Sequence, residues 1–153
     1  MANVDNPHGF KWIRSVGSPV PLMDKITLAG TVAAGDTLVN GGSGTCTIGL
    51  SNSGTIHGVA AEAGDSGDEI LFYPAGPDNE FEAQCSGTFA ATMIGTAVDI
   101  EGTTGIQEVN EDASTEKVFQ ITGYNDNDEV GANTRVRGFF VRATYNDLED
   151  AET

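Results

Sequence analysis

Apolar residues in this chain recur in short runs that alternate with polar residues, the pattern of β-strands with one buried face. Between residues 25 and 145 the runs are rich in β-branched and aromatic residues, and Gly, Asn, Asp or Pro bounds each of them. The predicted strands are Lys25–Leu28, Thr37–Asn40, Thr45–Leu50, Thr55–Ala60, Glu69–Tyr73, Glu80–Gln84, Thr92–Ile100, Lys117–Thr122 and Thr134–Thr144. Turn signals about 8–12 residues apart favour a sandwich or barrel. We therefore expect an all-β fold, a small sandwich or barrel of about eight or nine short strands.

Helix is expected to be minor, because no stretch of about 11 residues or more keeps the apolar period of a helix. Val109–Lys117 can supply a single helical turn. Ser51–Gly54 separates two predicted strands and reads as a hairpin loop, and Asn40-Gly41 reads as a tight turn.

The two ends of the chain differ in composition from the middle. Residues 1–25 hold three of the five prolines, and proline is excluded from helix interiors and central strands. We expect residues 1–25 to form an extended N-terminal arm, residues 26–145 a β-rich body, and residues 146–153 an acidic C-terminal tail.

Within the arm, large apolar side chains alternate with basic ones. Phe10, Trp12 and Ile13 are the apolar members, and Lys11 and Arg14 are the basic ones. Trp12 is the only tryptophan of the chain, and a tryptophan is rarely left in water on a free segment. The arm is therefore the predicted binding element.

Charge is distributed very unevenly along the 153 residues. The net charge is −16, and the stretch from Ile26 to Glu116 carries fourteen carboxylates without a single Lys or Arg. Such a surface repels nucleic acid, whose phosphates need cationic partners. The apolar fraction of 39% is below the usual level of about 45–50%, which predicts a thin core or one completed by a neighbouring subunit.

No apolar run approaches the ~20 residues of a membrane helix, and the N-terminus does not resemble a secretory signal. We expect no membrane partner and synthesis in the cytoplasm of the producing cell. Cys46 and Cys85 should then be reduced, buried thiols.

Candidate catalytic chemistry is sparse. The two histidines are His8 in the arm and His57 in a predicted strand, and G-x-S-x-G does not occur. The cysteines have no C-x-x-C or H-x₃-H companion. The sequence therefore predicts no enzyme activity, no cofactor and no metal centre.

Two acidic loops were weighed as calcium sites. Asp126, Asp128 and Gly131 match ligand-loop positions, but Val130 breaks the pattern and Arg137 stands where a bidentate glutamate belongs. The second cluster consists of Asp65, Asp68 and Glu69. Acidic residues that cap their own turns explain both loops without a metal.

The last predicted strand carries three arginines. Arg135 and Arg137 share one face and Arg142 lies on the other, so we expect them to pair with carboxylates of the same or an adjacent subunit. The consecutive residues Phe139–Val141 require both faces to be covered, which favours an oligomer.

Several short motifs resemble the capsid decoration (cement) proteins of tailed bacteriophages. They are Met1–Lys11, Val32–Asp36, Tyr73–Gly76, Phe81–Gln84 and Asp128–Ala132. The chain departs from that family at Val141–Asn146, where an Ile-Asn-x-His-like segment is common, and at Trp12, where proline is common. The resemblance implies a β-rich protein, often a homotrimer, on the outside of an expanded phage head.

The resulting hypothesis is a structural virion protein that cements major capsid protein subunits. Its capsid-binding residues would be Phe10, Lys11, Trp12, Ile13 and Arg14, and its subunit contacts Arg135, Arg137 and Arg142. The acidic body would face outward, with no nucleic-acid or membrane partner. The alternative is a receptor- or glycan-binding β module of a phage fibre or spike.

Overall fold

The computed structural model describes residues 2–141 and is all-β, as the sequence predicts. Its only helical element within that range is a single 3₁₀ turn, η1 (Ala91–Met93). The strands are β1 (Lys11–Ser15), β2 (Asp24–Leu28), β3 (Thr37–Gly42), β4 (Thr45–Ile48), β5 (Gly58–Ala60), β6 (Glu69–Pro74), β7 (Asn79–Gln84), β8 (Ala97–Glu101), β9 (Glu108–Asn110), β10 (Phe119–Tyr124) and β11 (Arg135–Phe140).

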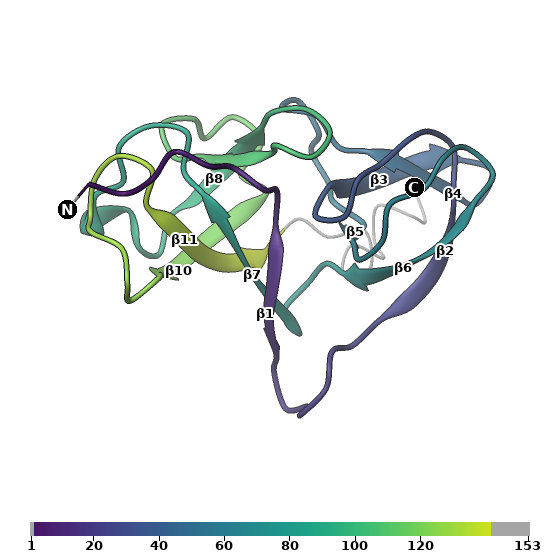
Figure 1. Cartoon of the computed structure of the whole chain (residues 1–153), viewed down its shortest axis with the longest axis horizontal. Helices are drawn as coiled ribbons and strands as arrows, with labels where there is room; N and C mark the ends of the chain where they lie inside the picture. Colours follow the sequence, from purple (N-terminus) through teal and green to yellow (C-terminus); the bar gives the residue numbers. More distant parts are fainter. Residues whose placement is uncertain (1, 142–153) are drawn as a thin grey trace.

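The strands form two lobes, which lie side by side in Figure 1. The sheet lobe is a six-stranded sheet in the order β1-β7-β11-β10-β8-β9, and all its neighbouring strands are antiparallel. The barrel lobe is a closed barrel in the order β2-β4-β3-β5-β6, in which only the β2–β4 pair is parallel. The barrel is thus inserted in the chain between the first two strands of the sheet.

Each lobe has its own hydrophobic core. The sheet-lobe core is built around packed aromatic rings, with centroids 5.1 Å apart for Phe119 and Phe140 and 5.5 Å apart for Phe81 and Phe140. The smaller barrel core includes Leu38 and Phe72. Residues from the barrel wall also join the sheet-lobe core, namely Ile56, Val59 and Ala75. The two lobes therefore share apolar packing.

A buried polar contact also joins the lobes. The Gln107 side chain, fully buried beside β9, accepts hydrogen bonds from the backbone N–H (2.7 Å) and hydroxyl (3.0 Å) of Thr37 in the barrel. Its amide nitrogen donates to the Gly49 carbonyl at 2.7 Å. Asp36 accepts from the backbone N–H of Gly105 at 2.8 Å, and its burial raises the pKa of its carboxyl. These bonds fix how the lobes are seated.

The observed strands differ from the predicted ones in three places. Val109 belongs to strand β9 rather than to a helical turn, and the first part of the predicted Thr92–Ile100 strand is η1. Ser51–Gly54 does not close a hairpin, because β5 pairs with β3 and β6 rather than with β4. The β3–β4 turn lies at Ser43-Gly44, where both residues have positive φ, just beyond the predicted Asn40-Gly41.

The largest difference concerns the N-terminal arm. Residues 2–10 are extended, but Lys11–Ser15 is the edge strand β1, paired with β7, and Asp24 and Lys25 already belong to β2. Much of the segment 1–25 is therefore part of the folded body. The tail 146–153 lies outside the described residues.

Candidate functional site

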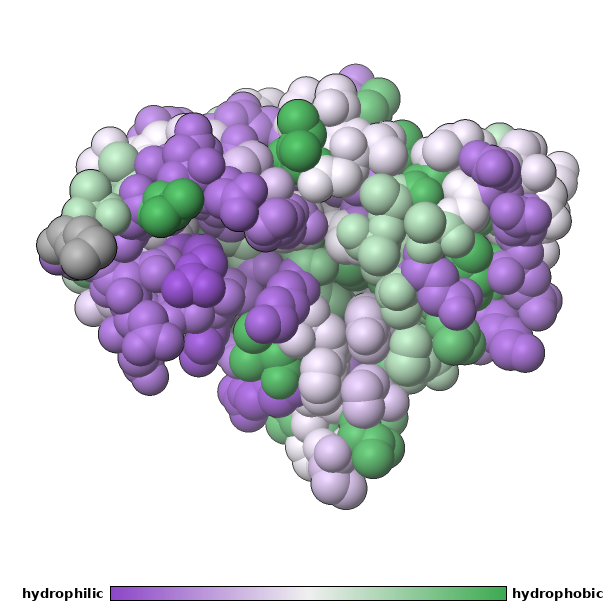
Figure 2. Space-filling view, viewed as in Figure 1, coloured by the Kyte–Doolittle hydropathy of each residue, from purple (hydrophilic) through white to green (hydrophobic). Residues whose placement is uncertain are grey.

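The most exposed apolar feature is the loop of residues 16–23 between β1 and β2, here called the apolar loop. It projects from the lower edge of the molecule in Figure 1, and Figure 2 shows mostly pale and green surface there, against purple over the sheet lobe. Its exposed side chains are Val16 (46%), Val20 (59%), Leu22 (40%) and Met23 (39%). Apolar side chains gathered on a projection are typical of a surface that contacts another molecule.

A hydrogen-bonded base holds the apolar loop in place. The Asn79 amide donates to the Leu22 carbonyl at 3.1 Å and to the Pro74 carbonyl at 3.0 Å. The Ser15 hydroxyl donates to Asn79 Oδ1 and accepts from the Leu22 N–H at 3.0 Å and from Trp12 Nε1 at 3.1 Å. Because Pro19 and Pro21 further restrict the backbone, the loop is largely ordered before any partner binds.

A shallow apolar groove of about 370 Å³ lies near the base of this loop. It is lined by Pro77, Gln120, Phe139, Phe140 and Val141. Phe140 is buried, whereas Phe139 is half-buried and Val141 is exposed. The sequence predicts cover on both faces of these residues, and within residues 2–141 one face remains partly open.

The predicted capsid-binding residues fall into two groups. Phe10 is buried, with its ring centroid 5.5 Å from Phe119 and 5.2 Å from Phe140, so it serves the core of its own chain. Trp12 is half-buried and stacks on Tyr73 at 6.0 Å. Neither ring is presented to a partner.

The other three members of that set remain at the surface. Lys11 and Arg14 are exposed and Ile13 is half-buried. Capsid binding by residues 10–14 stays a prediction, and only these three have side chains placed to take part. The alternation of Phe10 and Trp12 with Lys11 is itself a strand pattern, which the neighbouring prolines masked.

The outer face of β7 carries a row of buried polar side chains with cations on both sides. Glu80 accepts from Arg14 Nε of β1 at 3.1 Å, and Glu82 accepts from Arg137 Nε of β11 at 2.8 Å. The Asn125 amide also donates to Glu82, at 3.1 Å. Nearly all the charge on this face is thus neutralised within the chain.

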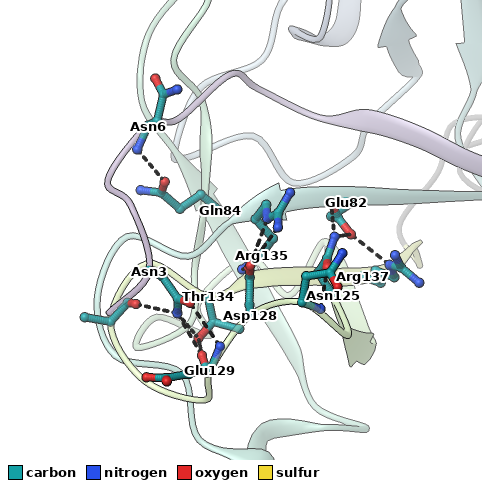
Figure 3. A network of polar contacts seen from close by, with 12 residues as sticks. Asn3, Asn6, Glu82, Gln84, Asn125, Asp128, Glu129, Thr134, Arg135 and Arg137 are labelled. Carbon is teal, nitrogen blue, oxygen red and sulfur yellow. Dashed lines mark hydrogen bonds and ion pairs between the residues drawn. The ribbon is translucent and has the colours of Figure 1, made fainter. Parts of the chain in front are cut away.

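The predicted subunit-contact arginines have partners of their own. Arg135 donates to Asp128 through Nη2 at 2.7 Å and Nε at 2.9 Å (Figure 3). These bonds hold the pKa of the Asp128 carboxyl below its usual value and raise that of Arg135. Arg137 is paired with Glu82, and Arg142 lies outside the described residues. The contact of these arginines with an adjacent subunit stays a prediction.

The N-terminal segment is tied to the end of the sheet lobe (Figure 3). The Asn3 amide donates to the carbonyls of Glu129 (2.7 Å) and Ala132 (2.9 Å), and Asn3 Oδ1 accepts from the Glu129 N–H at 3.0 Å. The Asn6 N–H donates to Gln84 Oε1 at 2.8 Å. These contacts order the segment against its own body.

The residues considered for chemistry are separated and occupied. His57 stacks on Phe72 at 5.1 Å, and burial lowers the pKa of its ring. Cys46 lies in the barrel core and Cys85 in the sheet-lobe core, both as free thiols whose pKa burial raises to about 11. A buried, protonated thiol is a poor nucleophile. His8 lines a polar surface pocket together with Gln84.

The two acidic loops show the bonds expected of capped turns. Asp128 Oδ2 accepts from the backbone N–H of Arg135 at 2.7 Å, and Asp68 Oδ2 accepts from that of Asp65 at 2.9 Å. Across the described range 2–141, no three His, Cys, Asp or Glu side chains form a group that could hold a metal ion.

Comparisons with known proteins add no name. Neither the scan against models of protein families nor the search of curated proteins finds a match for this chain. In the part of the chain that the structure describes, no helix has the length and apolar character needed to cross a membrane.

Proposed function

We propose that this chain is a structural protein of a bacteriophage virion that binds the outer surface of the head and cements neighbouring major capsid protein subunits. The observation that carries the proposal is the apolar loop, which projects from an otherwise strongly acidic molecule. Residues 6–23, which include this loop, contain no carboxylate and two cations, Lys11 and Arg14. An acidic protein surface can therefore approach this edge without repulsion.

Cementing needs modest contacts that are repeated many times. A single copy that inserts a few apolar side chains buries less area than a stable binary complex, but a shell multiplies the contact. The base formed by Asn79 and Ser15 lowers the ordering cost of docking, because the loop is already held in one conformation. Lys11 and Arg14 lie on the adjoining strand β1 and would contact acidic groups of the capsid.

The rest of the surface suits the outside of a head. The cation-free stretch from Ile26 to Glu116 repels DNA and keeps free copies apart in the host cytoplasm, where the protein would be made. Docked through the apolar loop, the acidic body would face the medium.

We propose further that copies associate, as a homotrimer, through the groove that contains Pro77 and Phe139. Arg135 and Arg137 already have partners within the chain, so the apolar groove is the better candidate for the contact. Subunits that cover one another's half-buried Phe139 would complete the thin apolar content of the chain.

The rival function, a glycan- or receptor-binding module, would need exposed aromatic rings for stacking. Phe81 and Phe89 are fully buried, and Tyr73 and Tyr124 pack against the sheet-lobe core. The aromatic residues thus favour the cementing role over this alternative.

The test is binding to expanded heads that lack this protein, measured by co-sedimentation. Val20→Asp combined with Leu22→Asp should weaken binding at least about tenfold, since two carboxylates would enter an apolar contact. Leu50→Asp is the matched control, because Leu50 is equally exposed (53%) but follows β4 on the barrel lobe. Saturation of the heads by the double variant at unchanged affinity would rule out the apolar loop as the docking element. Glycan-array binding by the wild-type protein would instead support the rival function.

A further inference from the structure

An orphaned carboxylate oxygen lies at the acidic end of strands β8 and β9. Glu111 follows β9 and is only 6% exposed. Its Oε1 is the one buried side-chain nitrogen or oxygen among residues 2–141 that has no hydrogen-bond partner. Its other oxygen, Oε2, accepts only a long 3.4 Å bond from the Ser86 hydroxyl. Leaving a carboxylate oxygen buried and unpaired is costly, so a ligand for it is expected.

A second carboxylate oxygen faces the same place. A side chain on Gly87 would collide with Glu111 Oε1 and come within 3.2 Å of Asp112 Oδ2. The missing Cβ at Gly87 therefore leaves a recess that both oxygens border. Two carboxylates that converge on one recess repel each other unless a cation or a proton lies between them.

The surroundings supply negative charge and no balancing side chain. Burial, followed by the neighbouring Asp112, raises the pKa of Glu111. Burial is also the main cause of the raised pKa of Glu108, to which the charges of Asp5, Glu101 and Glu111 add. Within the described residues, the Lys and Arg ion pairs involve Glu80, Glu69, Asp128 and Glu82, none of which belongs to this cluster.

We propose that Glu111 and Asp112 bind a divalent cation in the Gly87 recess, and that the cation is of the calcium class. All the side-chain donors are oxygens, the ligand type that calcium prefers over zinc or copper. Two carboxylates alone do not enclose a metal, so water and backbone carbonyl oxygens complete its shell. The dissociation constant should accordingly be weak, about 10⁻⁴ to 10⁻³ M, as in calcium sites with few charged ligands.

The site would act on the N-terminal segment as well. The Gln84 amide nitrogen donates to Asp5 Oδ1 at 2.8 Å and to Glu108 Oε2 at 3.0 Å, so it links the segment to the acidic cluster. A cation that neutralises Glu111 and Asp112 would relieve the repulsion on Glu108 and hold this link more firmly.

The test is calcium titration of the chelator-stripped, full-length protein at neutral pH, followed by calorimetry and by thermal unfolding. We expect one saturable site per chain and a rise in melting temperature that saturates with it. Glu111→Gln and, independently, Gly87→Ala should each weaken binding at least about tenfold, the first by removing charge and the second by filling the recess. Asp126→Asn removes one charge from an exposed turn of the same lobe and should leave the affinity unchanged.

Two results would overturn the proposal. One is the absence of saturable calcium binding at millimolar concentration in a folded wild-type protein, which would identify Glu111 as a carboxyl kept protonated by burial. The other is an equal loss of affinity in Asp126→Asn, which would reduce the effect to general screening of the acidic surface. Neither readout involves the capsid, so the cation site and the cementing role can fail separately.

Discussion

The two lobes of this protein are stabilised in different ways. The barrel lobe encloses a core of seven buried residues, and its five strands close on themselves so that no edge strand is left unpaired. The sheet lobe buries sixteen residues, with four phenylalanine rings in mutual contact, but it has open edges at β1 and β9. Backbone closure therefore dominates in the barrel and side-chain packing in the sheet lobe. Substitutions in the two lobes should have different consequences.

The largest effect is expected from the aromatic cluster. Phe119→Ala should lower the free energy of unfolding by about 3–5 kcal/mol, because its ring contacts both Phe10 and Phe140 in a fully buried site. Phe72→Ala in the barrel should cost less, since that ring stacks only on His57 among the aromatic residues described. Urea denaturation followed by circular dichroism measures both. Equal losses in the two variants would contradict the contrast between the lobes.

A smaller effect is expected at the polar junction of the lobes. Gln107→Leu leaves the Thr37 N–H and the Gly49 carbonyl buried without their partner, and should cost about 1–3 kcal/mol. Gln120→Leu is the control, because its amide makes only an exposed 3.2 Å bond to the Gly95 carbonyl. If Gln107 couples the lobes, its variant should also separate the unfolding of Trp12, followed by fluorescence, from that of the barrel. Coincident, unshifted transitions would show that apolar packing alone seats the lobes.

The smallest effect concerns pH in calcium-free buffer. The pKa of Glu111 is raised by burial, so the folded state takes up its proton more readily than the unfolded chain does. Its contribution to stability is therefore fully present below the unfolded pKa, about 4.3, and is lost as pH rises through the raised folded value. Glu111→Gln should flatten this dependence and be slightly more stable than wild type at neutral pH, as measured by urea denaturation across pH 4–8. A variant with the wild-type slope would show that Glu111 is not the group responsible.

The sequence predicted the β-strands well because short apolar alternation bounded by turn residues survives almost any tertiary context. Strand β7 is an example, since Phe81 and Ala83 face the core while Glu82 and Gln84 face outward, in register with the predicted period. Cys46 and Cys85 are buried free thiols, as expected for small apolar residues in strands and turns.

The failures come from long-range pairing, which a local pattern does not contain. β1 was read as a free arm because prolines follow it, yet its partner is Glu80–Glu82, more than sixty residues further along the chain. β9 is only three residues long and is formed by pairing with β8. The Glu111 recess depends on how three turns meet, and its only sequence signal is the adjacent pair Glu111-Asp112 next to a cation-free stretch.

The insertion of the barrel between β1 and β7 sets an order of events during synthesis. β1 is among the first segments to leave the ribosome, but its partner strand ends at Gln84, and the whole barrel must be translated in between. The barrel strands pair only with one another, so they can close while β7 is still in the exit tunnel. Until then Phe10 and Trp12 are exposed to the cytoplasm. The nascent chain thus passes through a stage in which a folded barrel trails an unpaired, aromatic leading strand, and this is the stage at which a chaperone would be needed.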